Sequence, residues 1–350
     1  MTLRRAAAIA ASLVTLAACT GRAGPVGATA SAPATGSTSP AASATSELTP
    51  APTPTATQPP AALSLSGLPG AAGKPVIAVK IDNTPPAIPQ TSVNDADIVY
   101  VEVVEGDTTR LMAVFQSQVP TVVGPVRSGR ESDLEILAAY GRVALAYSGA
   151  QPAVEAMIRS APLHPYEEGA AGFFRSTARY APYNLYLDPQ RLLAAHPDLP
   201  TAHNIGFVFG APLGDGTPAK SVTVTMSPYT KYGFSYDAAA QHWLASINGK
   251  PTTQTDGQRV WAGNVLVQQV TITASRFHDV LGLFTPRSHT VGSGAFTLLR
   301  PDGTQFTGTW RRATASAPTT YTDSSGVPVT FAPGRTWVLL APKGKSVVVK

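Results

Sequence analysis

Charged and amide side chains stand at the ends of three short apolar runs in the stretch 76–130. Asp82 and Asn83 follow the first run, Glu105 follows the second, and Arg110 begins the third. Carboxylates placed in this way could transfer protons, and arginine and asparagine could hold an anionic group by hydrogen bonds. The spacing therefore indicates a binding or catalytic site at the ends of these runs.

Two more arginines stand where a helix is predicted to begin. Arg127, Ser128 and Arg130 precede Glu131, and Ser128 with Glu131 three residues later is a capping-box pattern. The free backbone N–H groups at such a helix end attract phosphate or carboxylate. We therefore hypothesise an anion-binding site here. Glu131 argues partly against it, because its own carboxylate can occupy the helix end.

The same arginines could instead serve only the structure. Arg127 and Arg130 would then pair with carboxylates among Asp82, Glu102 and Glu105 and brace the loops that carry them. This stretch holds more charges than bracing requires, and rigid loops on a scaffold are common places for binding. Both interpretations stay open.

Catalysis by carboxylates is a further alternative. Glycoside hydrolysis needs two carboxyl groups roughly 5–9.5 Å apart, and Asp82 and Glu105 are the candidates for such a pair. Glu102 and Glu105 are separated by an odd number of positions, so a regular strand would direct them to opposite faces. The residues establish no reaction, and non-enzymatic binding is the favoured interpretation.

The sequence predicts neither a metal site nor a cofactor. Its six histidines are scattered, without the H-E-x-x-H spacing of a zinc site. Ser128 and Ser148 precede glycines, but neither lies in the G-x-S-x-G pattern of a nucleophilic serine. Cys19 is the sole cysteine, so no disulfide within the chain is expected.

The elements that must position these residues alternate between strand and helix. The predicted strands are 76–81, 98–104, 110–115 and 143–147, and the predicted helices begin at Ser128 and at Pro152. The second and third strands are close enough to form a hairpin, so a mixed sheet is expected. In open α/β sheets, ligands bind outside the carboxyl ends of the strands. Asp82, Glu105 and Arg127 share that placement, and we expect a pocket between the loops that carry Asp82 and Arg127.

Beyond about residue 203 the pattern becomes mostly β. The predicted strands are 222–226, 233–236, 264–272, 294–299, 307–310, 327–331 and 336–340. Asp302-Gly303 between two of them is a strong hairpin signal. The expected class is α+β, with an α/β N-terminal domain at 67–200 that contains a mixed sheet, and a β-rich C-terminal domain at 201–350.

The first residues are typical of a bacterial lipoprotein signal peptide, residues 1–18. Arg4 and Arg5 precede an apolar segment, and Leu16-Ala17-Ala18-Cys19 resembles a lipobox. We expect Cys19 to be the lipidation site, so that membrane lipid is a partner of the chain. An ordinary signal peptide with a chance cysteine is the alternative. No later stretch approaches the roughly 18 apolar residues of a membrane span.

Residues 19–66 are predicted to be a disordered tether. They are mostly Ala, Ser, Thr and Pro, which cannot bury enough apolar surface to offset the entropy of ordering. Proline favours an extended spacer. The expected location is therefore the outer face of the cytoplasmic membrane, with the folded part held away from the lipid.

Charge argues against a nucleic-acid partner. The net charge of the whole chain is +5, and removal of the two arginines in the signal peptide lowers it to +3. Nucleic-acid binding requires a concentrated basic face, and no block of Lys and Arg is present. The sequence does not indicate an oligomeric state.

Several motifs resemble one known family. They are Val79-Lys80-Ile81-Asp82-Asn83, Pro89-Gln90, Ala96-Asp97-Ile98-Val99-Tyr100, Glu105-Gly106 with Thr109-Arg110, Gly124-Pro125-Val126-Arg127-Ser128 with Arg130, Ala181-Pro182 with Asn184-Leu185-Tyr186, Asn264-Val265, Gly292-Ser293-Gly294, Gly308-Thr309-Trp310 and Pro333-Gly334 with Thr336-Trp337. The chain resembles the YerB-like bacterial lipoproteins over roughly residues 65–345. Gly106-Asp107 departs from the two glycines that many relatives carry. The resemblance implies an envelope location and two domains, and brings no established reaction.

These observations together predict a membrane-anchored extracytoplasmic lipoprotein. We expect a binding or scaffold module for cell-envelope polymer or envelope enzymes, with peptidoglycan or an envelope protein as partner. The alternative is a cell-wall-active hydrolase that uses Glu105 and Asp82.

Overall fold

The computed structural model describes residues 64–278 and 282–350. The predicted signal peptide, Cys19 and nearly all of the predicted tether lie outside the described residues. Leu65 and Ser66, at the end of the predicted tether, are described and buried.

Three α-helices, four short 3-10 helices and many strands make up the described residues. The helices are α1 (Glu131–Leu137), α2 (Pro152–Ser160), α3 (Pro189–Ala195), η1 (Pro85–Ala87), η2 (Val93–Asp95), η3 (Glu105–Asp107) and η4 (Ala138–Tyr140). The strands up to residue 218 are β1 (Ile77–Asp82), β2 (Ile98–Val103), β3 (Thr109–Phe115), β4 (Ala144–Ala146), β5 (His164–Tyr166), β6 (Phe173–Arg175), β7 (Leu185–Leu187) and β8 (Thr217–Pro218). The later strands are β9 (Ser221–Thr225), β10 (Lys231–Asp237), β11 (His242–Ile247), β12 (Lys250–Pro251), β13 (Trp261–Ala262), β14 (Asn264–His278), β15 (Phe284–His289), β16 (Gly292–Leu299), β17 (Thr304–Arg312), β18 (Thr320–Thr322), β19 (Thr336–Pro342) and β20 (Val347–Val349).

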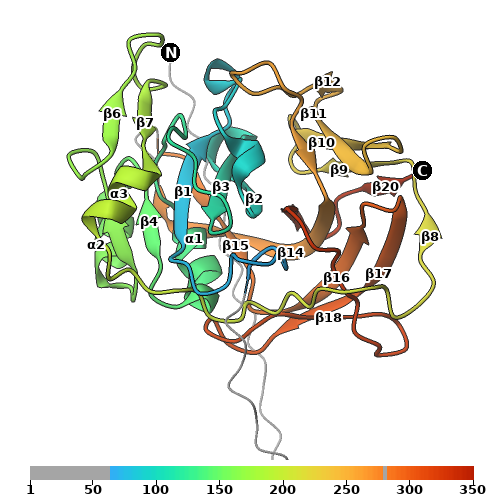
Figure 1. The fold of residues 1–350 in the computed structure, drawn as a ribbon. Helices are drawn as coiled ribbons and strands as arrows, with labels where there is room; N and C mark the ends of the chain where they lie inside the picture. Colours follow the sequence, from blue (N-terminus) through green and yellow to red (C-terminus); the bar gives the residue numbers. More distant parts are fainter. Residues whose placement is uncertain (1–63, 279–281) are drawn as a thin grey trace, which may run out of the picture. The chain divides into compact units, whose positions relative to one another are not determined.

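A mixed sheet contains 12 of the described strands (Figure 1). Its order is β18-β17-β16-β14-β19-β2-β3-β1-β4-β5, with β15 beside β14 and β8 beside β17. Strands from both sides of residue 200 therefore share one sheet. The domain boundary near residue 200 stays a prediction.

The middle of this sheet explains how the early charged residues meet. β2 and β3 form an antiparallel hairpin, and β1 lies antiparallel to β3 on its other side. β19 lies between β2 and β14 and is parallel to both. β1 is parallel to β4.

Each face of the sheet packs in its own apolar core. Ile77, Val79 and Ile81 of β1 pack with residues of β7, α3 and a second sheet of order β12-β11-β10-β9-β20. Ala78 of β1 and Met112 of β3 point to the other face, where they pack with residues of α1 and α2. Alternation along each strand produces this division.

The expected α+β class and the hairpin of β2 and β3 are confirmed. The Asp302-Gly303 hairpin is confirmed too, since it joins β16 to β17 in antiparallel register. The predicted strand 327–331 is wrong. Pro328, which has no N–H to donate, and Phe331 make only isolated bridges there, to Thr322 and Phe209.

The predicted start of the first helix is also wrong. Ser128 is not the N-cap, because α1 begins at Glu131 with Arg130 as its cap residue. The carboxylate that accepts the cap N–H belongs to Asp133, at 2.7 Å from the Arg130 nitrogen. The preceding backbone stays extended because its N–H groups bond elsewhere, Arg127 N to Lys80 O and Gly129 N to Gly149 O.

Candidate functional site

Alternation along β1, β2 and β3 brings four charged side chains to one face of the sheet. Asp82 of β1 and Glu102 of β2 both pair in register with Arg110 of β3. Lys80 precedes Asp82 by two residues and shares its face. The side chains at the ends of the three predicted strands therefore meet, next to the first turn of α1.

Asp82 is held by Arg127. The carboxylate of Asp82 is fully buried, and its Oδ2 lies 3.0 Å from Nε of Arg127. Its Oδ1 accepts the N–H of Thr84 at 2.9 Å. The two loops also bond through the backbone, since Asp82 N donates to Pro125 O and Arg127 N donates to Lys80 O, both at 2.9 Å. The loops thus contact each other directly where a pocket between them was expected.

Glu105 is held by Arg130. Nη2 and Nε of Arg130 donate to Oε2 of Glu105 at 2.8 and 3.1 Å, and the Thr285 hydroxyl donates to Oε1 at 2.8 Å. Burial raises the pKa of Glu105, but the Arg130 guanidinium and the Thr285 hydroxyl outweigh it, so the pKa lies below its ordinary value. Glu105 is therefore a stable carboxylate at neutral pH.

The other predicted site residues lie around these two pairs. Arg110 is buried and donates to Ser128 O at 3.4 Å. Burial, together with the nearby Arg130, lowers the pKa of Arg110 to about 10, which keeps it protonated at neutral pH. Asn83 donates to the hydroxyls of Thr109 and Tyr232. Asn83 thereby connects β1 to β10.

A second group of charges at this end of the sheet is completely buried. Lys80, Glu102 and Asp133 are each at most 1% exposed. Nζ of Lys80 lies 2.8 Å from Oδ1 of Asp133 and also donates to Oε1 of Glu102. Burial and the neighbouring Asp133 raise the pKa of Glu102 to about 7, against the opposing effect of Lys80. Sequence reasoning missed Lys80 and Asp133, because their meeting depends on where α1 packs.

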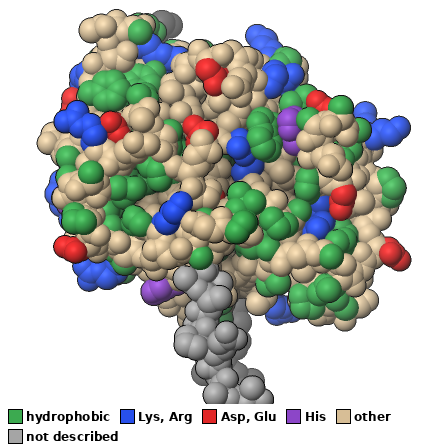
Figure 2. Space-filling view, viewed as in Figure 1, with side chains coloured by type: hydrophobic (Ala, Val, Ile, Leu, Met, Phe, Trp, Pro, Cys, Tyr) green, Lys and Arg blue, Asp and Glu red, His purple; other side chains and the backbone are tan. Residues whose placement is uncertain are grey.

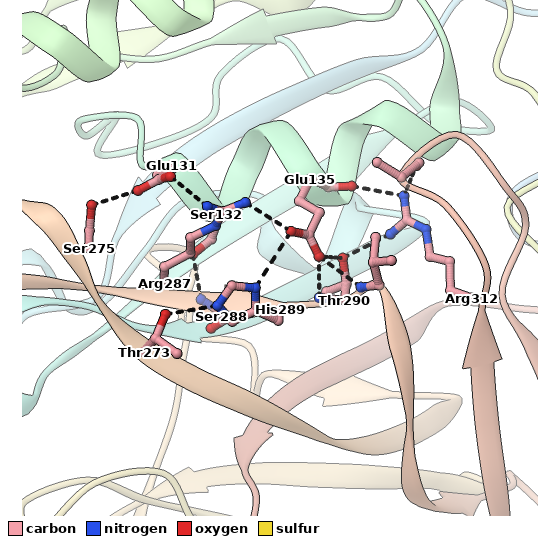
Figure 3. Close-up of polar contacts among 12 residues, drawn as sticks. Glu131, Ser132, Glu135, Thr273, Ser275, Arg287, Ser288, His289, Thr290 and Arg312 are labelled. Atoms are coloured by element: carbon pink, nitrogen blue, oxygen red, sulfur yellow. Dashed lines mark hydrogen bonds and ion pairs between the residues drawn. The ribbon is translucent and has the colours of Figure 1, made fainter. Parts of the chain in front are cut away.

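Polar side chains of α1 fix the helix against the β14–β15 hairpin (Figure 3). Glu131 accepts the Ser275 hydroxyl at 2.6 Å and pairs with Arg287 at 2.9 Å. Glu135 accepts the backbone N–H groups of Thr290 and Val291 at 2.6 and 2.7 Å. Glu131 therefore serves the packing of the helix. It does not occupy the helix end as the capping pattern predicted.

Arg127 lines a hollow of about 340 Å³. The hollow is also lined by the turn Ser148-Gly149 and by Glu167, Glu168 and Arg175. Arg175 is occupied, since its Nε lies 2.6 Å from Glu168 and its Nη1 lies 2.8 Å from Asn184.

Arg127 uses only part of its guanidinium group in the contact with Asp82. Within residues 64–278 and 282–350, its η nitrogens have no hydrogen bond or ion pair, while Nε faces Asp82. The ring of Tyr183 lies 5.9 Å from the guanidinium carbon. The Arg127 side chain is 26% exposed. Within the described residues, the Arg127 guanidinium is thus ion-paired at Nε, and neither η nitrogen is engaged.

The charges of the described surface are mixed in sign. On the face shown in Figure 2, Lys and Arg side chains are interspersed with Asp and Glu and do not gather into one patch. In the part of the chain that the structure describes, no three His, Cys, Asp or Glu side chains are placed to hold a metal ion. No helix of that part is both long and apolar enough to cross a bilayer.

Comparisons with known proteins agree with the resemblance seen in the motifs. Residues 65–202 match the family "Protein of unknown function (DUF3048) N-terminal domain", and residues 222–338 match the corresponding C-terminal domain. The chain is 25% identical over 279 residues to the "Putative lipoprotein YerB" of Bacillus subtilis (strain 168), over 76% of this chain and 81% of that protein.

A solved structure shares the fold. The crystal structure of the YerB protein from Bacillus subtilis matches with a TM-score of 0.70 at 23% identity, over 82% of this chain and 99% of that one. The two family matches together span most of the residues that the structure describes. The chain belongs to the DUF3048 family and carries both its N-terminal and its C-terminal domain.

Proposed function

We propose that this protein is a binding module of the cell envelope, anchored to the membrane by lipid on Cys19, which takes an anionic group of an envelope polymer or protein at Arg127. The similarity to a putative lipoprotein supports the envelope location. The binding role rests on one observation: Arg127 lines a hollow, and its η nitrogens have no partner among the described residues.

The chemistry of Arg127 favours a carboxylate or a phosphate. Its guanidinium presents paired N–H donors in a planar fork, which matches both groups. The buried Asp82 fixes its orientation, so little side-chain entropy is lost on binding. The acidic groups of peptidoglycan fit this description, and peptidoglycan is the first ligand to test.

The geometry supports the hydrolase alternative less well. Glu105 and Asp82 both face arginines, and Asp82 is fully buried. A general acid needs a raised pKa, whereas the pKa of Glu105 is lowered. Glu102 has a raised pKa but is 1% exposed. The candidate carboxylates are therefore held as structural ion pairs.

The test is sedimentation of the full chain with insoluble peptidoglycan, combined with measurement of released soluble fragments. Arg127→Lys keeps a positive charge beside Asp82 but loses the fork, so we expect binding to fall roughly tenfold or more, as for one charge-assisted hydrogen bond. Arg191→Gln, at an exposed position of α3, is the matched control and should bind like the wild type.

Two outcomes would change the proposal. Equal binding by the wild type and Arg127→Lys would remove Arg127 from the site. Fragment release that disappears in Glu105→Gln would establish the hydrolase instead.

A further inference from the structure

Lys80, Glu102 and Asp133 form a buried group that the proposed binding role does not use. Their side chains come from β1, β2 and α1, and each is at most 1% exposed. The neighbouring residues on this face are Ala78, Tyr100 and Met112, all part of the apolar core. No ligand from solvent can reach the group, so its chemistry must be internal.

The charges of this group do not cancel. One ammonium faces two carboxylates, and ionised groups are costly to bury unless they are fully paired. Oε2 of Glu102 is buried and has no hydrogen-bond partner in the described residues. An amide bond between Lys80 and one carboxylate would remove one positive and one negative charge from this buried group.

We infer that Lys80 and Asp133 form an intramolecular amide bond, with Glu102 as the residue that moves the protons. Nζ of Lys80 lies 2.8 Å from Oδ1 of Asp133, and the carboxyl carbon is one covalent bond further. Nζ of Lys80 is therefore in direct contact with the carboxyl group that it would attack. The bond would join β1 directly to α1.

The proton and bond changes balance. Glu102 takes one proton from the Lys80 ammonium, and the neutral amine attacks the carboxyl carbon of Asp133. The bond from that carbon to Oδ1 breaks, and this oxygen leaves as water with one proton from Glu102 and one from Nζ. An amide N–H remains, and Glu102 returns to its starting state.

Local contacts assign the roles of the two carboxylates. Oδ2 of Asp133 accepts the backbone N–H of Arg130 at 2.7 Å, which polarises the carboxyl group and suits Oδ2 to become the amide oxygen. The pKa of Glu102, raised by burial and by Asp133 to about 7, suits proton transfer at neutral pH.

Burial favours formation of the amide bond and its persistence. Reacting groups fixed in contact behave as if present at on the order of 10⁵ M or more. Exclusion of water opposes hydrolysis of the product. Disulfides cannot serve the folded part, since Cys19 is the sole cysteine.

Mass spectrometry of the purified full chain tests the inference. Trypsin cleaves after Arg130 and Arg142, so Asp133 lies in the peptide 131–142. After denaturation and digestion of the wild type, we expect this peptide to be attached to a second peptide, which contains Lys80 and is not cleaved after it. The mass of the linked product should equal the sum of the two peptide masses minus one water. Fragmentation spectra should place the link at Asp133.

Variants separate the roles. Lys80→Met and Asp133→Ala should release peptide 131–142 free, and Glu102→Gln should leave most of it free. Glu131→Gln, on the same turn of α1, is the matched control and should stay linked. Fully free peptide 131–142 in the wild type would overturn the inference, whatever the variants do. A link to Glu102 in place of Asp133 would overturn the assigned roles.

Discussion

At the scale of single residues, the site is a set of ion pairs in which the η nitrogens of Arg127 have no partner among the described residues. Asp82 is covered by Arg127 and Glu105 by Arg130, so both carboxylates that sequence reasoning offered for catalysis have partners within the chain. Arg127 differs from Arg130, because within the described residues only its Nε is engaged, and its side chain lines a hollow. The ion pair with Asp82 thus involves the guanidinium that we propose as the anion-binding group.

Glu105 should make the stability of the protein depend on pH. Because its folded pKa lies below the ordinary 4.5, the ion pair stabilises the native state above pH 4.5, and this stabilisation is lost as the pH falls through the lower, folded pKa. Glu105→Gln should lower the free energy of unfolding by on the order of 1 kcal/mol at pH 7, and the difference should shrink below pH 4.5.

Urea denaturation of the wild type and of Glu105→Gln at several pH values checks this expectation. Asp256→Asn, at an exposed turn, is a suitable control. A difference that is constant from pH 7 to below pH 4 would show that Arg130 does not stabilise the ionised form.

At the scale of elements, local patterns predicted the central strands of the large sheet, from β17 to β4 in its order, but not how the helix meets the sheet. β1, β2 and β3 were predictable because short β-branched runs end at turn residues. The start of α1 was misplaced because Ser128 and Glu131 match a capping pattern that the extended backbone before Arg130 excludes. Lys80 and Asp133 are 53 positions apart, so only the docking of α1 by Glu131 and Glu135 brings them together.

The hairpin between β16 and β17 provides a test at this scale. Gly303 has φ of 77°, and a Cβ there would lie 2.7 Å from the ring of Tyr236. Gly303→Ala should lower the free energy of unfolding by about 2 kcal/mol or more, through backbone strain and displacement of Tyr236. Gly257 has φ of 83° and open space around it, so Gly257→Ala should cost only about 1 kcal/mol.

Denaturation curves of both glycine variants separate strain from contact. Equal losses at Gly303 and Gly257 would show that the Tyr236 contact contributes nothing to the stability of the hairpin.

At the scale of the whole molecule, the sheet joins the segments that the family description divides. β2 and β3 lie within residues 65–202, whereas β14 and β16 lie within residues 222–338, and β19 connects the two sets. The signal-peptide pattern and nearly all of the tether pattern lie outside the described residues. They could be interpreted from composition, because lipidation and disorder depend on local sequence.

Lipid anchoring is the prediction that belongs to this scale. Cys19→Ala should move the protein from the membrane fraction to the soluble fraction, because two or more acyl chains are needed for stable attachment. Cell fractionation with immunoblotting measures the ratio, and Thr20→Ala is the control that should stay with the membrane. Retention of Cys19→Ala in the membrane fraction would contradict lipidation at this residue.

The position of β19 also sets when the protein can become folded. Thr336 pairs with Ile98 on one side and with Asn264 on the other, so β2 and β14 each keep an open edge until residues 336–342 arrive. Pairings so distant in the sequence form late, because loop closure must precede them. The central sheet therefore cannot be complete before residues 336–342 are available to pair with β2 and β14. A chain that ends before residue 336 would leave one edge of β2 and one edge of β14 unpaired. Such a chain should aggregate or be degraded by proteases.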